Sequence, residues 1–230
     1  YRSARIALPL LKKIAVKGMP LLFNEALWSA SVAVLNQCYS TRGLTVVAAN
    51  NIASTLWNLF SVCFISLGSA TGIIIGQMLG AGKPADEVRD CDRKLIAFSV
   101  TSCAVFGIAM AAVSGVFPLI YKTDNSVRSL ATAFICINAV IMPFNAYANA
   151  AYFTLRSGGK TLSTPLFDSC FVWVVSVPVA YTLSRFTGIA ILPLYAVCQS
   201  AEILKCVIGY IMLRRGSWIK NIVQTHPDAE

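Results

Sequence analysis

Glu25, Asp168 and Glu202 are carboxylates that lie inside long apolar stretches of this sequence. A charged side chain in the hydrocarbon of a membrane is costly, so each of these residues must face a partner, a water-filled cavity or an interface. A carboxylate held in such a place can exchange a proton or coordinate a small cation. The chemistry that these residues offer is therefore the coupling of an ion or a proton to some other event.

Glu25 is the most informative of the three. It lies well inside its apolar stretch, between Asn24 and Trp28, and no Lys or Arg lies at helical spacing from it. We hypothesise that Glu25 exchanges a proton or binds a small cation while a cavity opens in turn to either side of the membrane. The alternative is a satisfied hydrogen bond between two helices.

The other two carboxylates have nearby cations that favour structural interpretations. Lys205 follows Glu202 by three residues, which is close enough on a helix for an ion pair, and its long side chain can also reach toward the membrane surface. Asp168 lies near the start of its apolar stretch, where anchoring at the interface or a bond to Lys160 or Arg156 explains it as well as function does. We predict structural or gating roles for this group.

A polar stripe runs along the next apolar stretch. Its members recur every three to four residues, which gives one polar face on an otherwise apolar helix: Asn50, Asn51, Ser54, Asn58 and Ser61. Such a face meets water or other helices. We prefer a cavity wall, lined by Asn24, Asn51, Ser54 and Asn58.

Further along the same stretch, glycines recur with a strict spacing of four: Gly68, Gly72, Gly76 and Gly80. Glycines at this spacing share one helical face and let a neighbouring helix approach closely. We predict helix packing here, with a sliding or bending surface as the alternative.

Prolines lie inside three of the apolar stretches, at Pro20, Pro143 and Pro178. Proline removes a hydrogen bond of the helix and can kink it, and neighbouring helices in a membrane compensate for the loss. Kinks at membrane depth suit a cavity.

Enzymatic motifs are missing from the sequence. His226 lies in the tail, so no Ser-His-Asp or Cys-His arrangement can be built inside the apolar stretches, and there is no G-x-x-x-x-G-K-S/T phosphate loop. The eight cysteines form no C-x-x-C pair, so we predict no metal site and no disulfide. We expect neither an enzyme nor a protein that binds ATP, and no cofactor apart from Na⁺ or H⁺ as a coupling ion.

The composition shows which elements must position these residues. Hydrophobic residues make up 57% of the chain and charged residues only 13%, whereas a soluble domain has about 25% charged residues. We predict an all-α integral membrane protein of about six transmembrane helices. The expected division is a lead-in over 1–13, a helical lobe over 14–213 and a tail over 214–230. The expected spans are 14–39, 44–79, 95–120, 127–155, 165–183 and 189–213.

The charges indicate how these spans are oriented. Residues 83–94 are too highly charged for hydrocarbon and must lie in water, and most Lys and Arg residues lie on this side together with both termini. The positive-inside rule makes that side cytoplasmic. We therefore expect a multi-pass protein of the cell membrane with both ends of the chain in the cytoplasm. The net charge is +9, but the basic residues form no continuous stripe along the sequence. We therefore do not expect nucleic acid as a partner.

Several short motifs resemble one transporter family. The segment 72–83 resembles the motif of a glycine, a Gly-Gln pair and a Leu-Gly-Ala-Gly turn that precedes a charged loop in multidrug and toxic compound extrusion (MATE) transporters. Pro143-Phe144 with the segment 155–161 resembles a further pair of motifs of that family, and so do Val177 to Tyr181 and Ala48 to Ile52.

The resemblance implies a fold and a partner. It implies helices seven to twelve of a twelve-helix transporter of the wider MOP flippase superfamily, whose two six-helix lobes surround a central cavity. Because the chain starts at Tyr1 without a methionine, we expect it to be a fragment whose N-terminal lobe is missing. Glu25 resembles the acidic residue that many members carry on helix seven, whereas Lys160 stands where many members have an aspartate.

Together these observations predict one lobe of a secondary antiporter. It would export organic cations or amphiphilic drugs through the bilayer in exchange for Na⁺ or H⁺, with Glu25 as the coupling residue. Two alternatives stay open. One is a flippase for lipid-linked oligosaccharides, which shares the fold but needs a more basic cavity, and the other is an inactive or non-transporting membrane fragment.

Overall fold

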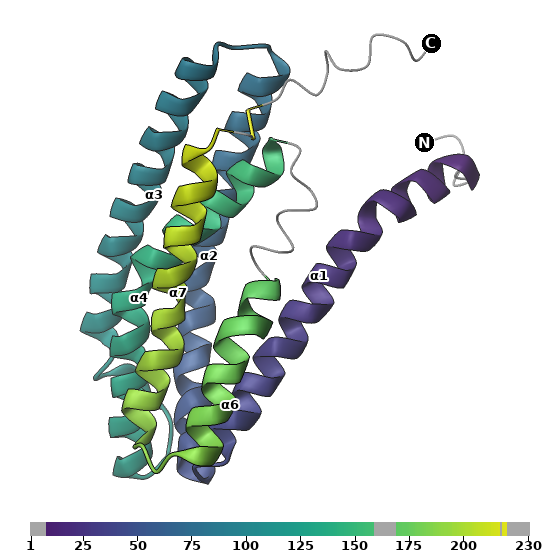
Figure 1. The fold of residues 1–230 in the computed structure, drawn as a ribbon. Coiled ribbons are helices and arrows are strands. Elements are labelled where there is room, and N and C mark those ends of the chain that lie inside the picture. Colours follow the sequence, from purple (N-terminus) through teal and green to yellow (C-terminus); the bar gives the residue numbers. More distant parts are fainter. Residues whose placement is uncertain (1–7, 159–168, 217, 220–230) are drawn as a thin grey trace, which may run out of the picture.

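The computed structural model describes residues 8–158, 169–216 and 218–219, and every regular element in these residues is helical. The lobe is therefore all-α, as the sequence predicts (Figure 1). The long helices are α1 (Leu8–Ser40), α2 (Leu44–Gly80), α3 (Ala85–Val113), α4 (Asn125–Ser157) and α7 (Ile191–Arg214). The shorter elements are the 3₁₀ turn η1 (Phe117–Ile120), the π-helical segment η3 (Val172–Ser176) and α6 (Val177–Phe186).

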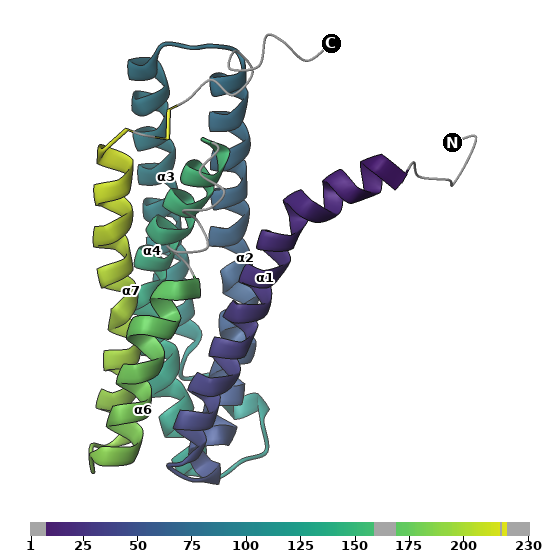
Figure 2. The same cartoon turned by 45° about the vertical axis from the view of Figure 1, so that its right-hand side comes forward.

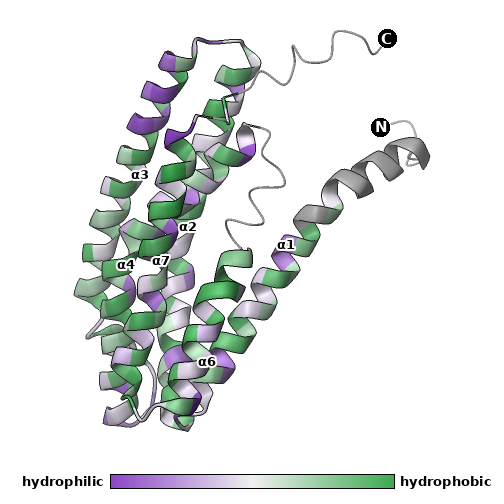
Figure 3. Ribbon diagram, viewed as in Figure 1, coloured by the Kyte–Doolittle hydropathy of each residue, from purple (hydrophilic) through white to green (hydrophobic). Residues whose placement is uncertain are grey.

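Within the described residues, four helices are long and apolar enough to cross a membrane, namely α2, α3, α4 and α7, and 172–186 is a shorter apolar helical stretch. The 37 residues of α2 extend roughly 55 Å at 1.5 Å per residue, which exceeds the thickness of the hydrocarbon. Hydrophobic residues follow the helices along most of their length, and hydrophilic residues gather at the turn between α2 and α3 (Figure 3). The chain is thus a multi-pass membrane protein.

Short turns end the helices at glycines. Gly43, with φ of 111°, separates α1 from α2, and Gly82, with φ of 69°, follows the last turn of α2. Both angles fall where side chains other than that of glycine are strained. After Gly82 the chain reaches Pro84, which precedes the first residue of α3. The predicted turns at 41–43 and 80–84 lie at these points.

The start of α3 differs from the expected span of 95–120. The helix begins at Ala85, so the charged residues of 83–94 are helical, and ion pairs of 3.0 Å (Lys83 to Glu87) and 2.6 Å (Lys94 to Asp90) lie along its exposed side. Charge excludes this stretch from hydrocarbon but does not prevent a helix, since such pairs at i,i+4 support one. The apolar part of α3 still begins at residue 95.

The prolines lie inside helical segments. Pro143 is within α4 and does not end it. Pro178 is the second residue of α6, two positions after the end of η3. A wider π turn is one way for a helix to accommodate the missing N–H and the bulk of a proline ring. Pro20 belongs to α1, which bends along its length in Figure 2.

The helices form two groups. α2, α3, α4 and α7 make a bundle, while α1 and α6 lie beside each other and diverge from that bundle toward the N-terminal end of α1 (Figures 1 and 2). At the opposite end, the Arg42 guanidinium donates hydrogen bonds to the carbonyl oxygens of Leu183 (3.2 Å) and Thr187 (2.6 Å). At the same end, the ring of Tyr39 in α1 packs against the ring of Tyr195 in α7, with centroids 5.4 Å apart. The two groups are therefore joined at one end.

Candidate functional site

Glu25 lies at the middle of α1, and its side chain is exposed. Within the described part of the chain, no hydrogen bond or ion pair reaches its carboxylate. The large side chains around it, Phe23 and Trp28, are also exposed, at 68% and 46%. A mid-helix carboxylate is thus held on a free face of this lobe.

Asn24, the neighbour of Glu25, points the other way. It is 1% exposed, and the Ser169 hydroxyl lies 2.7 Å from its Oδ1 and 2.9 Å from its backbone oxygen. Three residues further along α1, the carbonyl oxygen of Leu27 accepts a 3.0 Å hydrogen bond from the indole N–H of Trp173. Asn24 therefore lies in the contact between α1 and the π-helical region, where it holds the turn that carries Glu25.

The predicted polar stripe of α2 divides between two environments. Asn51 and Asn58 are exposed and Ser54 is half-buried, so these three side chains are available to line a cavity. Asn50 is 8% exposed, and its Nδ2 donates a 3.0 Å hydrogen bond to Oδ1 of Asn36 in α1. The exposed amides and the exposed carboxylate thus lie on the two consecutive helices that this bond joins.

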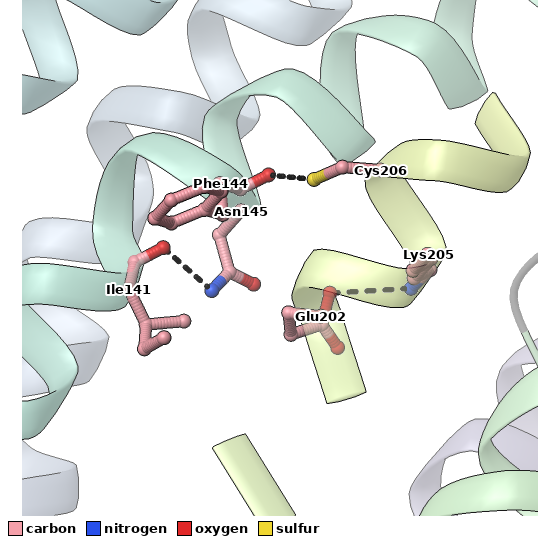
Figure 4. A network of polar contacts seen from close by, with 6 residues as sticks. All are labelled: Ile141, Phe144, Asn145, Glu202, Lys205 and Cys206. Carbon is pink, nitrogen blue, oxygen red and sulfur yellow. Dashed lines mark hydrogen bonds and ion pairs between the residues drawn. The ribbon is translucent and has the colours of Figure 1, made fainter. Parts of the chain in front are cut away.

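Glu202 and Lys205 lie in the contact between α7 and α4 (Figure 4). Lys205 Nζ is 3.9 Å from Glu202 Oε2, and the two side chains are only 10% and 22% exposed. Next to them, the Cys206 thiol donates a 3.1 Å hydrogen bond to the carbonyl oxygen of Phe144. The next residue, Asn145, donates a 3.4 Å hydrogen bond from its Nδ2 to the carbonyl oxygen of Ile141. The pair therefore belongs to a polar helix contact.

The glycine stripe faces α4 over part of its length. A Cβ built on Gly68 would lie 2.5 Å from Asn149 Oδ1, and one on Gly72 would lie 3.1 Å from Phe153 Cβ. The Ser157 hydroxyl donates a 2.6 Å hydrogen bond to the Gly72 oxygen, which requires such close approach. A Cβ on Gly76 would first meet Ser157 at 3.8 Å, and one on Gly80 would meet nothing within 4 Å.

The remaining predicted site residues lie near the break in the described chain. Asp168 and Lys160 fall outside the described residues. Arg156 is half-buried in the last turn of α4, where it lines a small cavity of about 330 Å³ together with Ser157 and Gly72.

Sequence reasoning missed Asp92, which α3 buries against α4. It is 4% exposed, and Thr154 donates a 2.7 Å hydrogen bond to its Oδ1. Burial raises the pKa of Asp92 to about 6, with the bond from Thr154 and the charge of Arg93 acting in the opposite direction. The sequence does contain a signal for this burial, because Asp92 lies four residues from both Val88 and Ile96 and so shares an apolar helical face with them. The many charged residues of 83–94 made that spacing hard to recognise.

A second missed group consists of uncharged side chains inside the bundle. Asn138 of α4 is 2% exposed, and its Oδ1 accepts hydrogen bonds from the Tyr195 hydroxyl (2.9 Å) and from Gln199 Nε2 (2.6 Å). Amides within membrane spans are a detectable signal, since they need hydrogen-bond partners in the apolar interior. The sequence prediction considered the carboxylates within spans and left out Asn138 and Gln199.

The site therefore consists of an exposed carboxylate on α1 and exposed amides on α2. Polar contacts from α1 to Ser169 and Trp173 of the π-helical region, and the bond between Asn50 and Asn36, fix the two helices. Among the described residues, no cluster of three or more His, Cys, Asp or Glu side chains could hold a metal ion. All eight cysteines are free thiols. What the arrangement can do chemically is attract a cation or carry a proton.

Comparison with known proteins gives the family. The MatE family model matches residues 20–182. The chain is 27% identical over 176 residues to a probable multidrug resistance protein NorM of Mannheimia succiniciproducens and 29% identical over 187 residues to one of Pasteurella multocida. It is also 23% identical over 195 residues to the probable multidrug resistance protein YoeA of Bacillus subtilis.

These alignments cover 76%, 76% and 84% of this chain but only 37%, 38% and 42% of the three relatives. The chain thus spans well under half of their length. The family model, in contrast, covers more than half of this chain. The MATE motifs, the all-α membrane fold and the family match agree, and this protein belongs to the MatE family of transporters.

Proposed function

We propose that this chain is the C-terminal six-helix lobe of a secondary active antiporter that exports organic cations or amphiphilic drugs in exchange for Na⁺ or H⁺. The names of its relatives support the export of drugs, since NorM and YoeA are described as multidrug resistance proteins. The lobe works together with an N-terminal six-helix lobe that lies outside these 230 residues.

The observation that carries the proposal is the free carboxylate of Glu25 at the middle of α1. An unpaired carboxylate at that depth is costly in lipid, so its face must meet water or the other lobe. The same argument applies to Asn51 and Asn58 on α2, which are polar and exposed within a helix long and apolar enough to span the membrane. These side chains are the wall of a shared central cavity.

The mechanism follows from the charge on Glu25. A carboxylate attracts a proton, a sodium ion or an organic cation, and binding of one weakens the attraction for the next. Exchange arises when the ion displaces the drug while the cavity is open to one side and the drug displaces the ion on the other. Each ligand must favour a different state of the lobes for this cycle to run in one direction.

The structure of the lobe suits such a change of state. α1 and α6 diverge from the four-helix bundle and meet it at the Arg42 end, where Tyr39 of α1 packs against Tyr195 of α7 (Figures 1 and 2). Pro20 and Pro178 interrupt the hydrogen bonding of this pair. Movement of α1 and α6 against the bundle would shift Glu25 between the two openings.

The proposed orientation places this lobe in the cell membrane with both termini in the cytoplasm. Its charged end carries Arg89, Arg93, Arg214 and Arg215, whereas Arg42, Lys122 and Arg185 lie at the other end. The positive-inside rule assigns the first end to the cytoplasm.

The proposal is tested with the full-length transporter in a host whose own drug pumps have been deleted. Cells that produce it should keep a fluorescent organic cation out and should tolerate more of it. A Glu25→Gln variant should lose this protection and Glu25→Asp should keep part of it. Glu87→Gln is the matched control, since Glu87 is exposed at the charged end and pairs with Lys83.

The result that would overturn the proposal is a full-length protein that reaches the membrane and confers no efflux of any organic cation. Transbilayer movement of a lipid-linked oligosaccharide by that protein would then support a flippase. Absence of both activities would support a non-transporting membrane protein.

A further inference from the structure

A cavity of about 790 Å³ opens between α3, α4 and α7 at the charged end of the lobe. It is separate from the face that carries Glu25, because its walls come from the first half of α3 and from the last turns of α7. Three of its lining side chains are arginines, namely Arg89, Arg93 and Arg214. Nothing in the proposed exchange cycle uses this cavity.

The arginines gather at one rim. Arg93 and Arg214 have no ion-pair partner among the residues that the structure describes. The guanidinium of Arg89 lies against Gly216, just beyond the end of α7, so that a Cβ at Gly216 would meet it. Cations from two helices that are far apart in sequence therefore meet at the same opening.

Past this rim the lining is mostly apolar. Along α3 the wall continues from Arg93 through Ile96 to Val100, and Leu213 adds apolar surface beside Arg214. The remaining lining residues past the rim include Thr101, Tyr147 and Tyr210. From Arg89 to Val100 the helix rises roughly 16 Å at 1.5 Å per residue. The cavity thus has a cationic mouth at the level of the membrane surface and an apolar wall that runs into the level of the hydrocarbon.

The one carboxylate among the described residues that line the cavity is buried. Asp92 is 4% exposed, and its Oδ1 is held by Thr154 of α4 at 2.7 Å. It therefore fixes α3 against α4 and leaves the arginines to set the charge at the opening. Because the guanidinium groups outnumber this carboxylate, an organic cation is disfavoured there and an anion is favoured.

We propose that this cavity binds one anionic phospholipid, with the phosphate at Arg93 and Arg214 and the acyl chain along Ile96, Val100 and Leu213. Basic pockets between spans at the cytoplasmic surface are the setting in which anionic lipid headgroups bind. A bidentate guanidinium suits a phosphate. A soluble anion would use only the mouth, whereas a phospholipid uses the whole length of the wall.

The proposal is tested on the purified full-length transporter in detergent by native mass spectrometry. Short-chain phosphatidylglycerol and phosphatidylcholine are titrated separately, and the ratio of their apparent affinities is measured. The test variant is Arg93→Gln with Arg214→Gln. The matched control is Lys122→Gln with Arg185→Gln, which removes the same charge at the opposite end of the lobe. Each variant must keep the unfolding temperature of the parent.

The parent should prefer phosphatidylglycerol, and the test variant should lose most of that preference, since each cation near the surface contributes roughly fivefold. The control variant should keep it. The proposal is overturned if the test variant keeps the preference or if the control loses it equally. Equal competition by inorganic phosphate would also overturn it, because it would identify a simple anion site.

A further variant tests the acyl chain. Ala97 lines the apolar wall and is exposed, so Ala97→Trp should fill the wall and weaken binding of both lipids. Unchanged binding would overturn the assignment of the chain to this wall. A variant truncated after Ile219 tests another occupant. If lipid binds to this variant and not to the full-length protein, the segment 220–230 occupies the cavity instead.

Discussion

The Ser169 hydroxyl donates a 2.7 Å hydrogen bond to Oδ1 of Asn24, and this bond joins α1 to the π-helical region one residue away from Glu25. Both residues are almost fully buried, at 0% and 1% exposed. The Nδ2 atom of Asn24 has no partner within the described residues. The position of the proposed coupling carboxylate thus rests on this bond together with the bond from Trp173 to the carbonyl oxygen of Leu27.

Ser169→Ala should lower stability by about 1 to 3 kcal/mol, because a buried acceptor on Asn24 loses its donor. Thermal unfolding in detergent measures the change. Ser200→Ala is the control, since the Ser200 hydroxyl only bonds to Val197 of its own helix and is exposed. Equal effects of the two substitutions would contradict the importance of the contact between α1 and the π-helical region.

Gly107→Ala should separate α3 from α4. A Cβ at Gly107 would lie 2.7 Å from the carbonyl oxygen of Ala139, and a backbone atom cannot move aside as a side chain can. We expect a loss of roughly 1 to 3 kcal/mol, as for other overpacked contacts. Gly115→Ala, where a Cβ meets nothing within 4 Å, should be nearly neutral in the same unfolding experiment.

The stability of the bundle should depend on the protonation of Asp92. Burial raises the pKa of this carboxyl in the folded protein to about 6, from its ordinary value of 3.8. The folded state therefore binds the proton more tightly than the unfolded state, and stability should fall as the pH rises from about 4 to about 6. The loss should be on the order of 2 to 3 kcal/mol in total.

Asp92→Asn isolates this effect, because an amide keeps an acceptor for Thr154 and cannot ionise. Relative to the parent, the variant should gain stability above pH 6 and should show no gain near pH 4. Unfolding temperatures across this range provide the measurement. A difference between the two proteins that does not change with pH would show that Asp92 does not titrate in this window.

The amides of α2 should separate into functional and structural groups. Asn58→Leu should impair transport and leave the unfolding temperature nearly unchanged, since Asn58 is exposed. Asn50→Leu should lower the unfolding temperature, because it removes the 3.0 Å bond to Asn36. Transport and unfolding are measured on the same preparations, and a fall in stability for Asn58→Leu equal to that of Asn50→Leu would contradict the division.

Hydropathy and turn residues predict most helix positions because both are local properties. The predicted stretch 44–79 lies within one residue of α2, and 127–155 lies inside α4. The expected membrane span 95–120 starts ten residues after α3 does, because the charge of 83–94 excludes this stretch from hydrocarbon and leaves open whether it is helical. Charge can be read from the sequence, whereas the formation of the i,i+4 ion pairs that support the first turns of α3 is seen only in the structure.

The site was harder to predict, because its geometry depends on which helical faces meet. Glu25 could be selected from its type and its depth in an apolar stretch. That Asn24 is buried and Glu25 exposed depends on the packing of α1 against the segment that contains Ser169, which no local pattern encodes. The same holds for Asp92 and Thr154, which are 62 residues apart in the chain.

The central claim is that Glu25 couples the movement of an ion to the movement of a drug. The most direct test reconstitutes the full-length transporter in liposomes, imposes a proton gradient or a sodium gradient separately, and measures the flux of a labelled organic cation. One of the gradients should drive transport by the parent, and neither should drive it in Glu25→Gln, although that variant still reaches the membrane. Gradient-driven transport by Glu25→Gln at the rate of the parent would contradict the claim.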